Sequence, residues 1–393
     1  MPDTTPHTTP GTTIRFLHSG DWQLGMMRRF LGPEAQARYG QARVDAIESI
    51  GAVAARTSAA FVVVAGDVFD ANQVDRKVVL RACEALRAVP CPVYLLPGNH
   101  DSLEPGSVWA SPMLAAHLPS HVEVLRDSVP RTPAPGVEVV GAPWRTRRPL
   151  RDPVADVLDA DPPAAGGLRV LVGHGQVDSL APDVGEPALI RQDPLEEAIA
   201  AGRIHYAALG DRHSRTSVGE SGRIWYAGTP EPTRPEEEHP GDVLLVELAT
   251  GPGGSTCTVT PERVGTWRLL SQVVEVDGDA SLDALDRWLG EQPDKARTVV
   301  RLGVRGALPV AGLTRLEVLL DAQTEVYAAI QRWRRHWDVG VLPDDRMLDD
   351  LPVTGPARAA LEELRHTVAS GSDDAAEAAD ALALLHRLAG GAA

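Results

Sequence analysis

Short apolar segments that end in a glycine followed by polar residues recur along this chain, and they limit its fold more than any other feature. Their length and composition are typical of buried strands. In the stretches 37–58 and 76–89, between the first three segments, apolar residues recur at helical spacing. Strands that alternate with amphipathic helices predict a layered α/β fold. The strand-like segments are 14–18, 61–66, 92–98, 137–144, 168–174 and 204–210.

The pattern changes twice further along the chain. After residue 210, short segments separated by glycine-rich turns predict antiparallel strands and hairpins. A new α/β unit is expected to begin near Trp267, because apolar runs and helical spacing alternate again. Its expected elements are a strand over 267–276, a helix over 281–290, a strand over 296–306, and helical segments over 313–322 and 325–337.

The last fifty or so residues are rich in acidic residues and read as helices. A stripe of Leu382, Leu385 and Leu388 either packs on the protein, which we take as the default, or docks a partner. The chain therefore divides into a set of predicted parts. These are a disordered tail over 1–13, an α/β domain over 14–265, a small α/β domain over 266–342 and a helical tail over 343–393.

The formal net charge of −16 argues against a protein whose whole surface binds nucleic acid. It does not exclude a local phosphate site, since bound divalent cations reverse the local field. No apolar run is long enough to span a membrane, and the N-terminal stretch lacks the apolar segment of a secretory signal. The 3 cysteines lack metal-ligand spacing and are expected to be reduced thiols of a cytoplasmic protein.

Potential metal ligands follow nearly every strand of the first domain. In an open α/β sheet, ligands bind at the carboxyl ends of the strands, so these loops can converge on one point. Each residue alone also fits a turn, a helix cap or a hydrogen-bonded histidine. The ordered set is hard to explain as turns. It comprises Asp21 and Gln23, Asp67 and Asp70, Asn99 with His100 and Asp101, His174, and Asp211 with His213.

The set resembles the calcineurin-like metallophosphoesterase superfamily, whose motifs are D-x-H, G-D-x-x-D, G-N-H-D or E, a further His, and G-H-x-H. The stretches "GDVFD" and "LLPGNHD" are the most specific matches. The resemblance implies a layered α/β/β/α sandwich. The small α/β domain and the helical tail resemble, in layout alone, the capping domain and partner-binding region of SbcD-type DNA repair exonucleases.

Carried over by motif, the resemblance implies two divalent metal ions. Asp21, Gln23, Asp67 and His213 would hold the first ion. Asp67 would bridge to the second, whose other ligands would be Asn99, His174 and Asp211. His100 would be the general acid, with Asp101 orienting its ring.

Gln23 and Asp211 depart from the family pattern, since each stands where the family has a histidine. Each change replaces a nitrogen donor with an oxygen donor, and Asp211 adds a negative charge. Harder ligands favour Mn²⁺, our choice, over Zn²⁺, with Mg²⁺ also possible. Because glutamine is a weak ligand, the first ion could bind weakly or not at all.

The expected function is a DNA phosphodiesterase, an exonuclease or endonuclease of the repair type, in which the metal ions activate a water. Expected partners are DNA and an SMC-like coiled-coil ATPase of the SbcC type, with a homodimer possible and no membrane. The alternatives are a small-substrate phosphoesterase, acting on cyclic nucleotides or phosphomonoesters, and a non-catalytic DNA-end scaffold with a degenerate metal site.

Several surface features allow more than one interpretation. The basic run 145–151 either tracks a nucleic-acid backbone or is a solvated loop. Arg28, Arg29, Arg212 and Arg215 could contact phosphates. Asp70 either anchors a neighbour or faces the substrate, and the stretch 234–241 reads as an exposed acidic turn.

Overall fold

The computed structural model describes residues 12–160, 167–181, 187–251, 254–343, 345–372 and 374–390. Most of the predicted disordered tail, residues 1–11, lies outside these described residues. The chain separates into two compact units, which are Met1–Arg28 with Gln36–Trp267 (unit 1) and Arg29–Ala35 with Arg268–Ala393 (unit 2). A search of the described residues found no helix with the length and apolar character needed to span a bilayer.

The first sheet of unit 1 carries the earliest predicted strands. Strands β1 to β4 run parallel, β11 pairs antiparallel with β1, and β12 pairs antiparallel with β11 at the edge. The order across the sheet is β12 (Gly254–Arg263), β11 (Asp242–Gly251), β1 (Thr13–Ser19), β2 (Val62–Val64), β3 (Val93–Leu95) and β4 (Val122–Val124).

The second sheet of unit 1 has a parallel centre, formed by β6, β7, β8 and β10, with an antiparallel strand at each edge. The hairpin-like strands expected after residue 210 form part of it. The order is β5 (Arg131–Ala134), β6 (Val137–Gly141), β7 (Leu168–His174), β8 (Tyr206–Gly210), β10 (Ile224–Tyr226) and β9 (Thr216–Val218).

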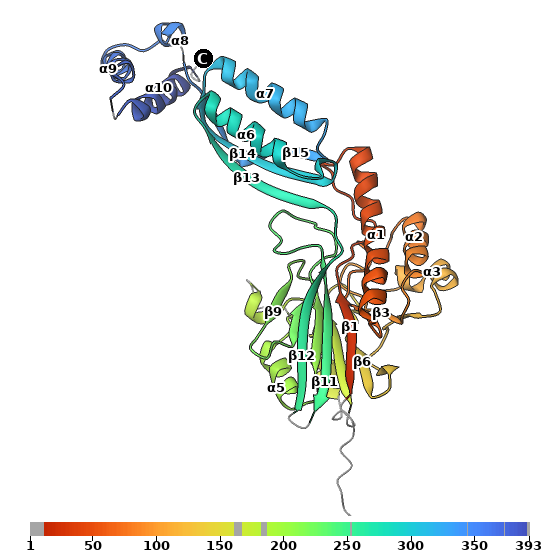
Figure 1. The fold of residues 1–393 in the computed structure, drawn as a ribbon. Coiled ribbons are helices and arrows are strands. Elements are labelled where there is room, and N and C mark those ends of the chain that lie inside the picture. Colours follow the sequence, from red (N-terminus) through yellow and green to blue (C-terminus); the bar gives the residue numbers. More distant parts are fainter. Residues whose placement is uncertain are drawn as a thin grey trace, which may run out of the picture. The chain divides into compact units, whose positions relative to one another are not determined.

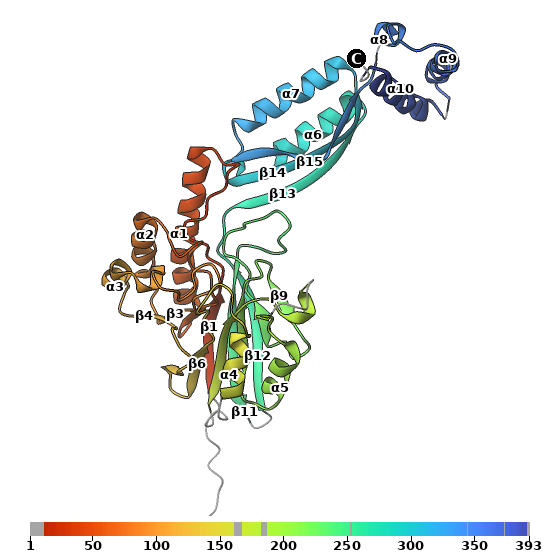
Figure 2. The same ribbon diagram turned by 180° about the vertical axis from the view of Figure 1, so that it is seen from behind.

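Three apolar cores stack these elements into four layers, which confirms the expected α/β/β/α sandwich (Figures 1 and 2). The central core lies between the sheets and includes Phe16, Phe61 and Tyr206. A second core packs one group of helices on the first sheet, and a third packs the other group on the second sheet. The first group is α1 (Pro33–Thr57), α2 (Arg76–Leu86) and α3 (Pro112–His117); the second is α4 (Pro153–Ala160) and α5 (Gln192–Ala200).

Unit 2 contains a parallel sheet with strand order β13–β14–β15. Helices α6 and α7 lie along one face of this sheet (Figures 1 and 2), where Leu282, Leu302 and Leu316 share a core. The elements are β13 (Arg268–Val276), α6 (Asp279–Glu291), β14 (Thr298–Leu308), α7 (Val310–Thr324) and β15 (Ala329–Val341).

The expectation of a helix over 325–337 is wrong, because most of this stretch belongs to strand β15. The strand is interrupted by a register shift opposite Leu302–Val304. Ile330 packs on the core before the shift, whereas Trp337 and Val339 do so after it. The shift breaks the simple alternation by which a strand is recognised in a sequence.

The expected helical tail is present as α8 (Asp345–Asp349), α9 (Pro356–Ser370) and α10 (Ala375–Gly390). Leu382 and Leu385 pack in a small core with Leu361, whereas Leu388 is 68% exposed. Two leucines of the predicted stripe therefore pack on the protein, in agreement with the default interpretation.

Candidate metal centre

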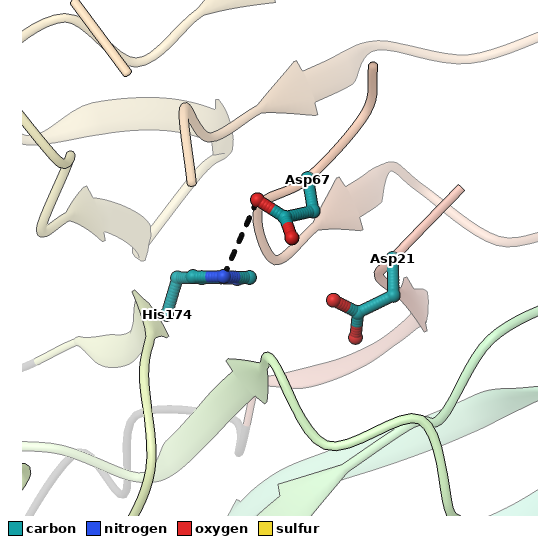
Figure 3. A group of neighbouring side chains, drawn as sticks. All are labelled: Asp21, Asp67 and His174. Carbon is teal, nitrogen blue, oxygen red and sulfur yellow. Dashed lines mark ion pairs between the residues drawn. The ribbon is translucent and has the colours of Figure 1, made fainter. Parts of the chain in front are cut away.

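The polar residues that follow the strands meet at one place in unit 1. Asp21 follows β1, Asp67 follows β2 and His174 ends β7, and all three are buried. One ligand atom from each lies within 4.8 Å of the others (Figure 3). Carboxylates and imidazole at such separations can bind divalent metal ions.

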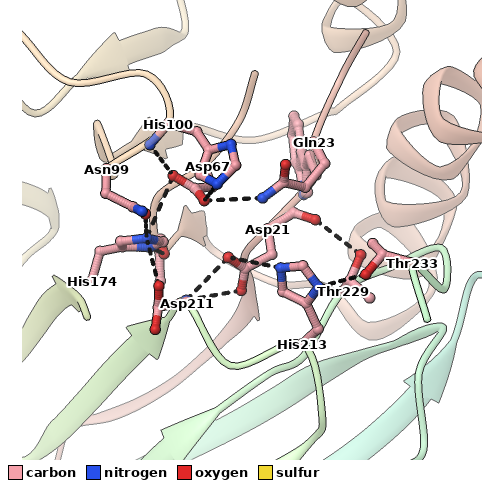
Figure 4. A network of polar contacts seen from close by, with 12 residues as sticks. Asp21, Gln23, Asp67, Asn99, His100, His174, Asp211, His213, Thr229 and Thr233 are labelled. Carbon is pink, nitrogen blue, oxygen red and sulfur yellow. Dashed lines mark hydrogen bonds and ion pairs between the residues drawn. The ribbon is translucent and has the colours of Figure 1, made fainter. Parts of the chain in front are cut away.

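The other predicted ligands surround this trio (Figure 4). Asn99 Oδ1 lies 2.8 Å from His174 Nε2, and Asp211 Oδ1 lies 3.8 Å from the same atom. His213 Nε2 lies 4.0 Å from Asp21 Oδ1. The Gln23 amide nitrogen donates a hydrogen bond to Asp67 Oδ2 at 2.9 Å. The structure thus brings together every residue that the motif resemblance nominated as a metal ligand.

The backbone at this cluster is strained. Asp21, Gln23, Asp67 and Asp211 have φ values of 52°, 49°, 51° and 98°. For residues with a Cβ atom, such conformations cost of order 1–3 kcal/mol each and persist mainly at functional sites. The strained loops aim these side chains at a common point.

Two glycines allow the loops to approach each other closely. A Cβ atom on Gly66, whose φ is 88°, would lie 2.0 Å from His174 Nδ1. A Cβ atom on Gly98 would lie 2.3 Å from Asp67 Oδ1. The glycines that precede Asp67 and Asn99 are therefore needed for contact between neighbouring strand ends.

Both histidines of the cluster are fixed through one ring nitrogen. His174 Nδ1 lies 2.9 Å from the Ala65 carbonyl oxygen and donates to it. His213 Nδ1 lies 2.7 Å from Thr233 Oγ1 and 3.1 Å from Glu237 Oε1. In each ring the Nε2 atom is left to face the carboxylates, as in metal-binding histidines whose other nitrogen is hydrogen-bonded.

Glu237 contacts a candidate metal ligand, although it lies in a stretch expected to be an exposed acidic turn. Its side chain is 6% exposed and contacts the His213 ring and Thr233. A carboxylate behind a ligand histidine raises the basicity of that ligand and fixes its orientation. A glutamate placed twenty-four positions after the histidine gives no local sequence signal of this contact.

Burial and crowding of charge shift the pKa values of the cluster. Burial, with the neighbouring carboxylates Asp67 and Asp211 adding to it, raises the pKa of Asp21 to about 7. Burial lowers the pKa of His174, but Asp67, Asp21 and Asp211 outweigh it and raise that pKa to about 9. Protons thus partly neutralise an excess of negative charge, which a divalent cation would also do.

The donor set fits divalent cations. Donor atoms bound to one cation at about 2.0–2.6 Å lie roughly 3–5 Å apart, and the separations in the cluster fall in this range or just below it. The Asn99 amide lies against His174 Nε2 and the Asp67 carboxylate, and its nitrogen donates to both once its oxygen and nitrogen are exchanged. The Gln23 amide nitrogen points toward Asp67, and its buried Oε1 has no hydrogen-bond partner among the described residues.

His100 lies at the edge of the cluster, with its side chain 44% exposed and Nε2 3.9 Å from Asp67 Oδ2. Asp101 does not orient this ring, contrary to the expectation from the motif. His100 Nδ1 contacts the Asp70 carbonyl oxygen at 2.8 Å instead. The buried Asp101 carboxylate accepts from the Gly98 and Phe69 backbone nitrogens, because its side chain points back between the two loops. Asp101 therefore fixes loops, whereas Asp70 anchors the His100 ring through its main chain and also lines the cavity over the cluster.

A cavity of about 710 Å³ opens over the cluster. Arg28, Arg212 and Arg234 line it together with His100 and Asp211. Of the other arginines expected to contact phosphates, Arg215 pairs with Asp242 at 2.5 Å and does not line the cavity. Cationic side chains around a metal cluster are suited to an anionic substrate such as a phosphate ester.

The family model described as calcineurin-like phosphoesterase matches residues 14–213, which contain every predicted metal ligand. The chain belongs to this family. A calcineurin-like phosphoesterase is a hydrolytic enzyme, and the buried cluster of Asp21, Asp67 and His174 is its candidate metal site.

Three solved structures are distantly similar to this chain. A Thermus thermophilus protein is 9% identical over 64% of this chain and 100% of its own, with a TM-score of 0.40. A Danio rerio dimetal phosphatase is 14% identical over 62% and 98%, with a TM-score of 0.37. A Thermus thermophilus 5′-nucleotidase precursor is 14% identical over 64% and 54%, with a TM-score of 0.29. No curated protein matches the chain.

Proposed function

We propose that this calcineurin-like phosphoesterase is a metal-dependent phosphodiesterase that acts on DNA, as an exonuclease or endonuclease of the repair type. One observation carries the proposal: the basic run 145–151 begins beside the catalytic edge of the cluster. Arg147 Nη2 lies 3.5 Å from the His100 carbonyl oxygen. Arg145 and Arg151 line a second cavity, of about 500 Å³, in the same stretch, where Arg151 pairs with Asp156 at 2.9 Å. Several arginines in one stretch beside the metal ligands suit a polymer of phosphates better than a single phosphate.

The cluster would hold two divalent cations, which would bind the phosphodiester and activate a water. Asp21, Gln23, Asp67 and His213 would hold one ion, and Asp67, Asn99, His174 and Asp211 would hold the other. We propose Mn²⁺ as the ion, because oxygen donors dominate while two imidazoles remain. The ion held by Gln23 would bind more weakly than the other ion, since the Gln23 amide nitrogen faces Asp67.

His100 would donate the proton to the leaving oxygen. Its Nδ1–H is held by the Asp70 carbonyl, so its Nε2 is the atom that can carry and release a proton on the cavity side. The side chain is partly exposed, so it can meet the substrate. General acid catalysis of this kind contributes typically about 10²–10⁴-fold to a rate.

A second candidate is a phosphoesterase of small substrates, such as cyclic nucleotides or phosphomonoesters. The cavity volume of about 710 Å³ favours it, because pockets for small ligands typically measure about 300–1,000 Å³. Two of the distant structural neighbours are named as a phosphatase and a 5′-nucleotidase. The third candidate, a DNA-end scaffold without catalysis, is motivated by Gln23 and Asp211, which stand where the family has histidines.

Unit 2 supports the comparison with SbcD-type exonucleases, since a compact phosphatase does not need it. We propose an SMC-like coiled-coil ATPase as the partner that supplies much of the DNA-binding surface. Such a partner suits a chain whose own net charge is −16. A homodimer and a cytoplasmic location are further parts of this proposal.

The test is cleavage of linear single-stranded and double-stranded DNA in the presence of Mn²⁺. Wild type should cut, and His100→Ala should be slower by about 10²-fold or more. His366→Ala, which removes an exposed histidine of α9, should cut like wild type. Hydrolysis of bis-p-nitrophenyl phosphate without any cleavage of DNA would support the small-substrate candidate instead. Equal cutting by wild type and His100→Ala would overturn the proposed role of His100.

A further inference from the structure

The register shift in β15 creates a bulge on the sheet of unit 2. Residues Val299–Leu302 pair with 329–332, and Val304–Leu308 pair with 337–341. The four residues 333–336 therefore stand opposite the single residue Gly303. A Cβ atom on Gly303 would lie 2.6 Å from the His336 Cβ atom, so the bulge folds over this glycine. Bulges of this kind redirect side chains and are often found next to functional sites.

The bulge lies on the face of the sheet that α6 and α7 do not cover. Leu302 and Val304 point into the core beneath these helices, so the alternate residues Arg301, Gly303 and Arg305 point to the opposite face. Helix α10 lines a small cavity with Gly306 and Gly340, towards the far end of these strands. Trp333 at the bulge stays partly exposed, and Arg335 stays exposed.

Arginines and aromatic rings are stacked at the bulge. The guanidinium carbon of Arg301 lies 4.3 Å from the centre of the Trp333 ring, and that of Arg335 lies 5.1 Å from it. The Trp333 and His336 rings lie 4.0 Å apart, centre to centre. Arg301 also donates to Ser271 Oγ at 2.9 Å. The guanidinium groups are thus held in place before any ligand binds.

The cluster has more hydrogen-bond donors than acceptors. Arg335 Nε lies 2.9 Å from His336 Nε2, and Arg305 contacts His336 Nδ1. A neutral imidazole can accept through one nitrogen only, so one of these arginines faces an N–H group. Within the described part of the chain, no ion pair is formed by Arg335 or by the neighbouring Arg334. Oxygens of a bound anion would relieve this surplus of donors.

Acidic residues stand in register with one arginine of this cluster: Glu275 and Asp338 pair with Arg305 on the neighbouring strands. Arg301 pairs in register with Ser271 and Gln331, whereas Trp333 and Arg335 lie in the bulge, outside the paired positions. Arg334 and Arg335 add two positive charges at the bulge, although the whole chain carries a net charge of −16.

We propose that this bulge, formed by Arg301, Trp333, Arg335 and His336, binds single-stranded nucleic acid. Guanidinium groups would contact the phosphates, and the rings of Trp333 and His336 would offer surfaces for unpaired bases. Aromatic rings interleaved with arginines are the combination by which proteins hold single strands without sequence preference. The inference rests on the proposed function for its ligand class, because it names a second contact with the same polymer.

Binding can be measured without catalysis. Fluorescence anisotropy of a labelled single-stranded DNA oligonucleotide, with the full chain in EDTA and about 50 mM salt, gives Kd and its salt dependence. The double variant Arg301→Gln/Arg335→Gln should raise Kd tenfold or more. It should also lower the slope of log Kd against log salt by about 1.4, or roughly 0.7 for each phosphate that the variant no longer binds.

The matched control is Arg315→Gln/Arg332→Gln, which removes two arginines that pair with Asp279, Asp283 and Glu317 on the helix side of the same unit. This control should bind like wild type. Trp333→Ala should weaken binding, and Trp333→Phe should retain most of it, which separates stacking from damage to the fold. Circular dichroism and thermal melting would show that each variant is folded.

The inference and the proposed function can fail separately. Loss of binding in the double variant, with no nuclease activity in wild type, would keep the inference and overturn the nuclease. Cleavage of DNA by wild type, with equal binding by the double variant and its control, would overturn the inference alone. Undetectable binding of single-stranded DNA by wild type at about 50 mM salt would also overturn it.

Discussion

The Nδ1 atom of His213 lies 3.1 Å from the Oε1 atom of Glu237. The other Glu237 oxygen accepts from the Thr233 backbone nitrogen at 2.8 Å. This carboxylate therefore fixes a candidate metal ligand from behind, although it lies outside every motif of the family pattern.

Replacement of Glu237 should weaken metal binding without unfolding the protein. In Glu237→Gln the His213 ring loses a charged partner, so affinity for Mn²⁺ should fall about 10–100-fold. Isothermal titration calorimetry measures this change. Glu238→Gln, at the exposed neighbouring position, is the control and should bind like wild type. Equal affinities for the two variants would show that Glu237 does not support the site.

Metal affinity should rise with pH between about 6 and 8. Asp21 and His174, whose pKa values are raised to about 7 and about 9, must lose their protons before they bind a cation. Mn²⁺ titrations at pH 6, 7 and 8 should give steadily lower Kd values and a release of protons. Affinity that is independent of pH would contradict the assigned ligands.

The stability of the metal-free protein should depend on pH in the opposite sense. Both pKa values are raised on folding, so the folded state holds more protons than the unfolded state. The stabilisation from these groups is complete below the unfolded pKa values and is lost as pH rises through about 7 and then about 9. The gain in Tm on adding Mn²⁺ should therefore be larger at pH 8 than at pH 6. An equal gain at both pH values would count against this reasoning.

Gln23→His should increase the affinity for Mn²⁺ at the weaker of the two proposed ion positions. Its imidazole would replace an amide whose nitrogen now faces Asp67. Metal analysis after dialysis should find about one Mn²⁺ per chain in wild type and about two in the variant. Gln41→His, on the surface of α1, controls for adventitious binding to a histidine. Two tightly held ions in wild type would show that Gln23 is no weak point.

Gly98→Ala should damage the site through its backbone. The added Cβ atom would lie 2.3 Å from Asp67 Oδ1. Such overpacking costs about 1–3 kcal/mol, and the displaced carboxylate should also lose affinity for Mn²⁺. Gly40→Ala in α1, where no atom lies within 4 Å of the new Cβ, should instead stabilise by up to about 1 kcal/mol. Urea unfolding measures both changes, and an unaltered Gly98→Ala protein would contradict the close approach of these loops.

Most of the layered fold and the ligand cluster could be predicted from the sequence, because each strand and its ligands are adjacent in the chain. Asp67, for example, follows a buried apolar run and a glycine, and both features are local. The role of Glu237 could not be predicted, since it depends on how the loop after β10 folds back on His213.

Two other features also depended on distant contacts. The His100 ring is held by a main-chain oxygen of Asp70, which has no side-chain signature in a sequence. The sequence of strand β15 predicts a helix, because the bulge between Ile330 and Trp337 changes which alternate residues face the core. Motifs therefore located the site, whereas the supporting contacts and the irregular strand required the structure.

The most direct test of the metal centre is a crystal structure of the protein grown with Mn²⁺, with data recorded to give the anomalous signal of manganese. The predicted result is anomalous density beside Asp67, at bonding distance of about 2.0–2.3 Å from its carboxylate and near His174 Nε2. Clear density for Asp21, Asp67, Asn99 and His174, with no anomalous peak among them at saturating Mn²⁺, would contradict the account.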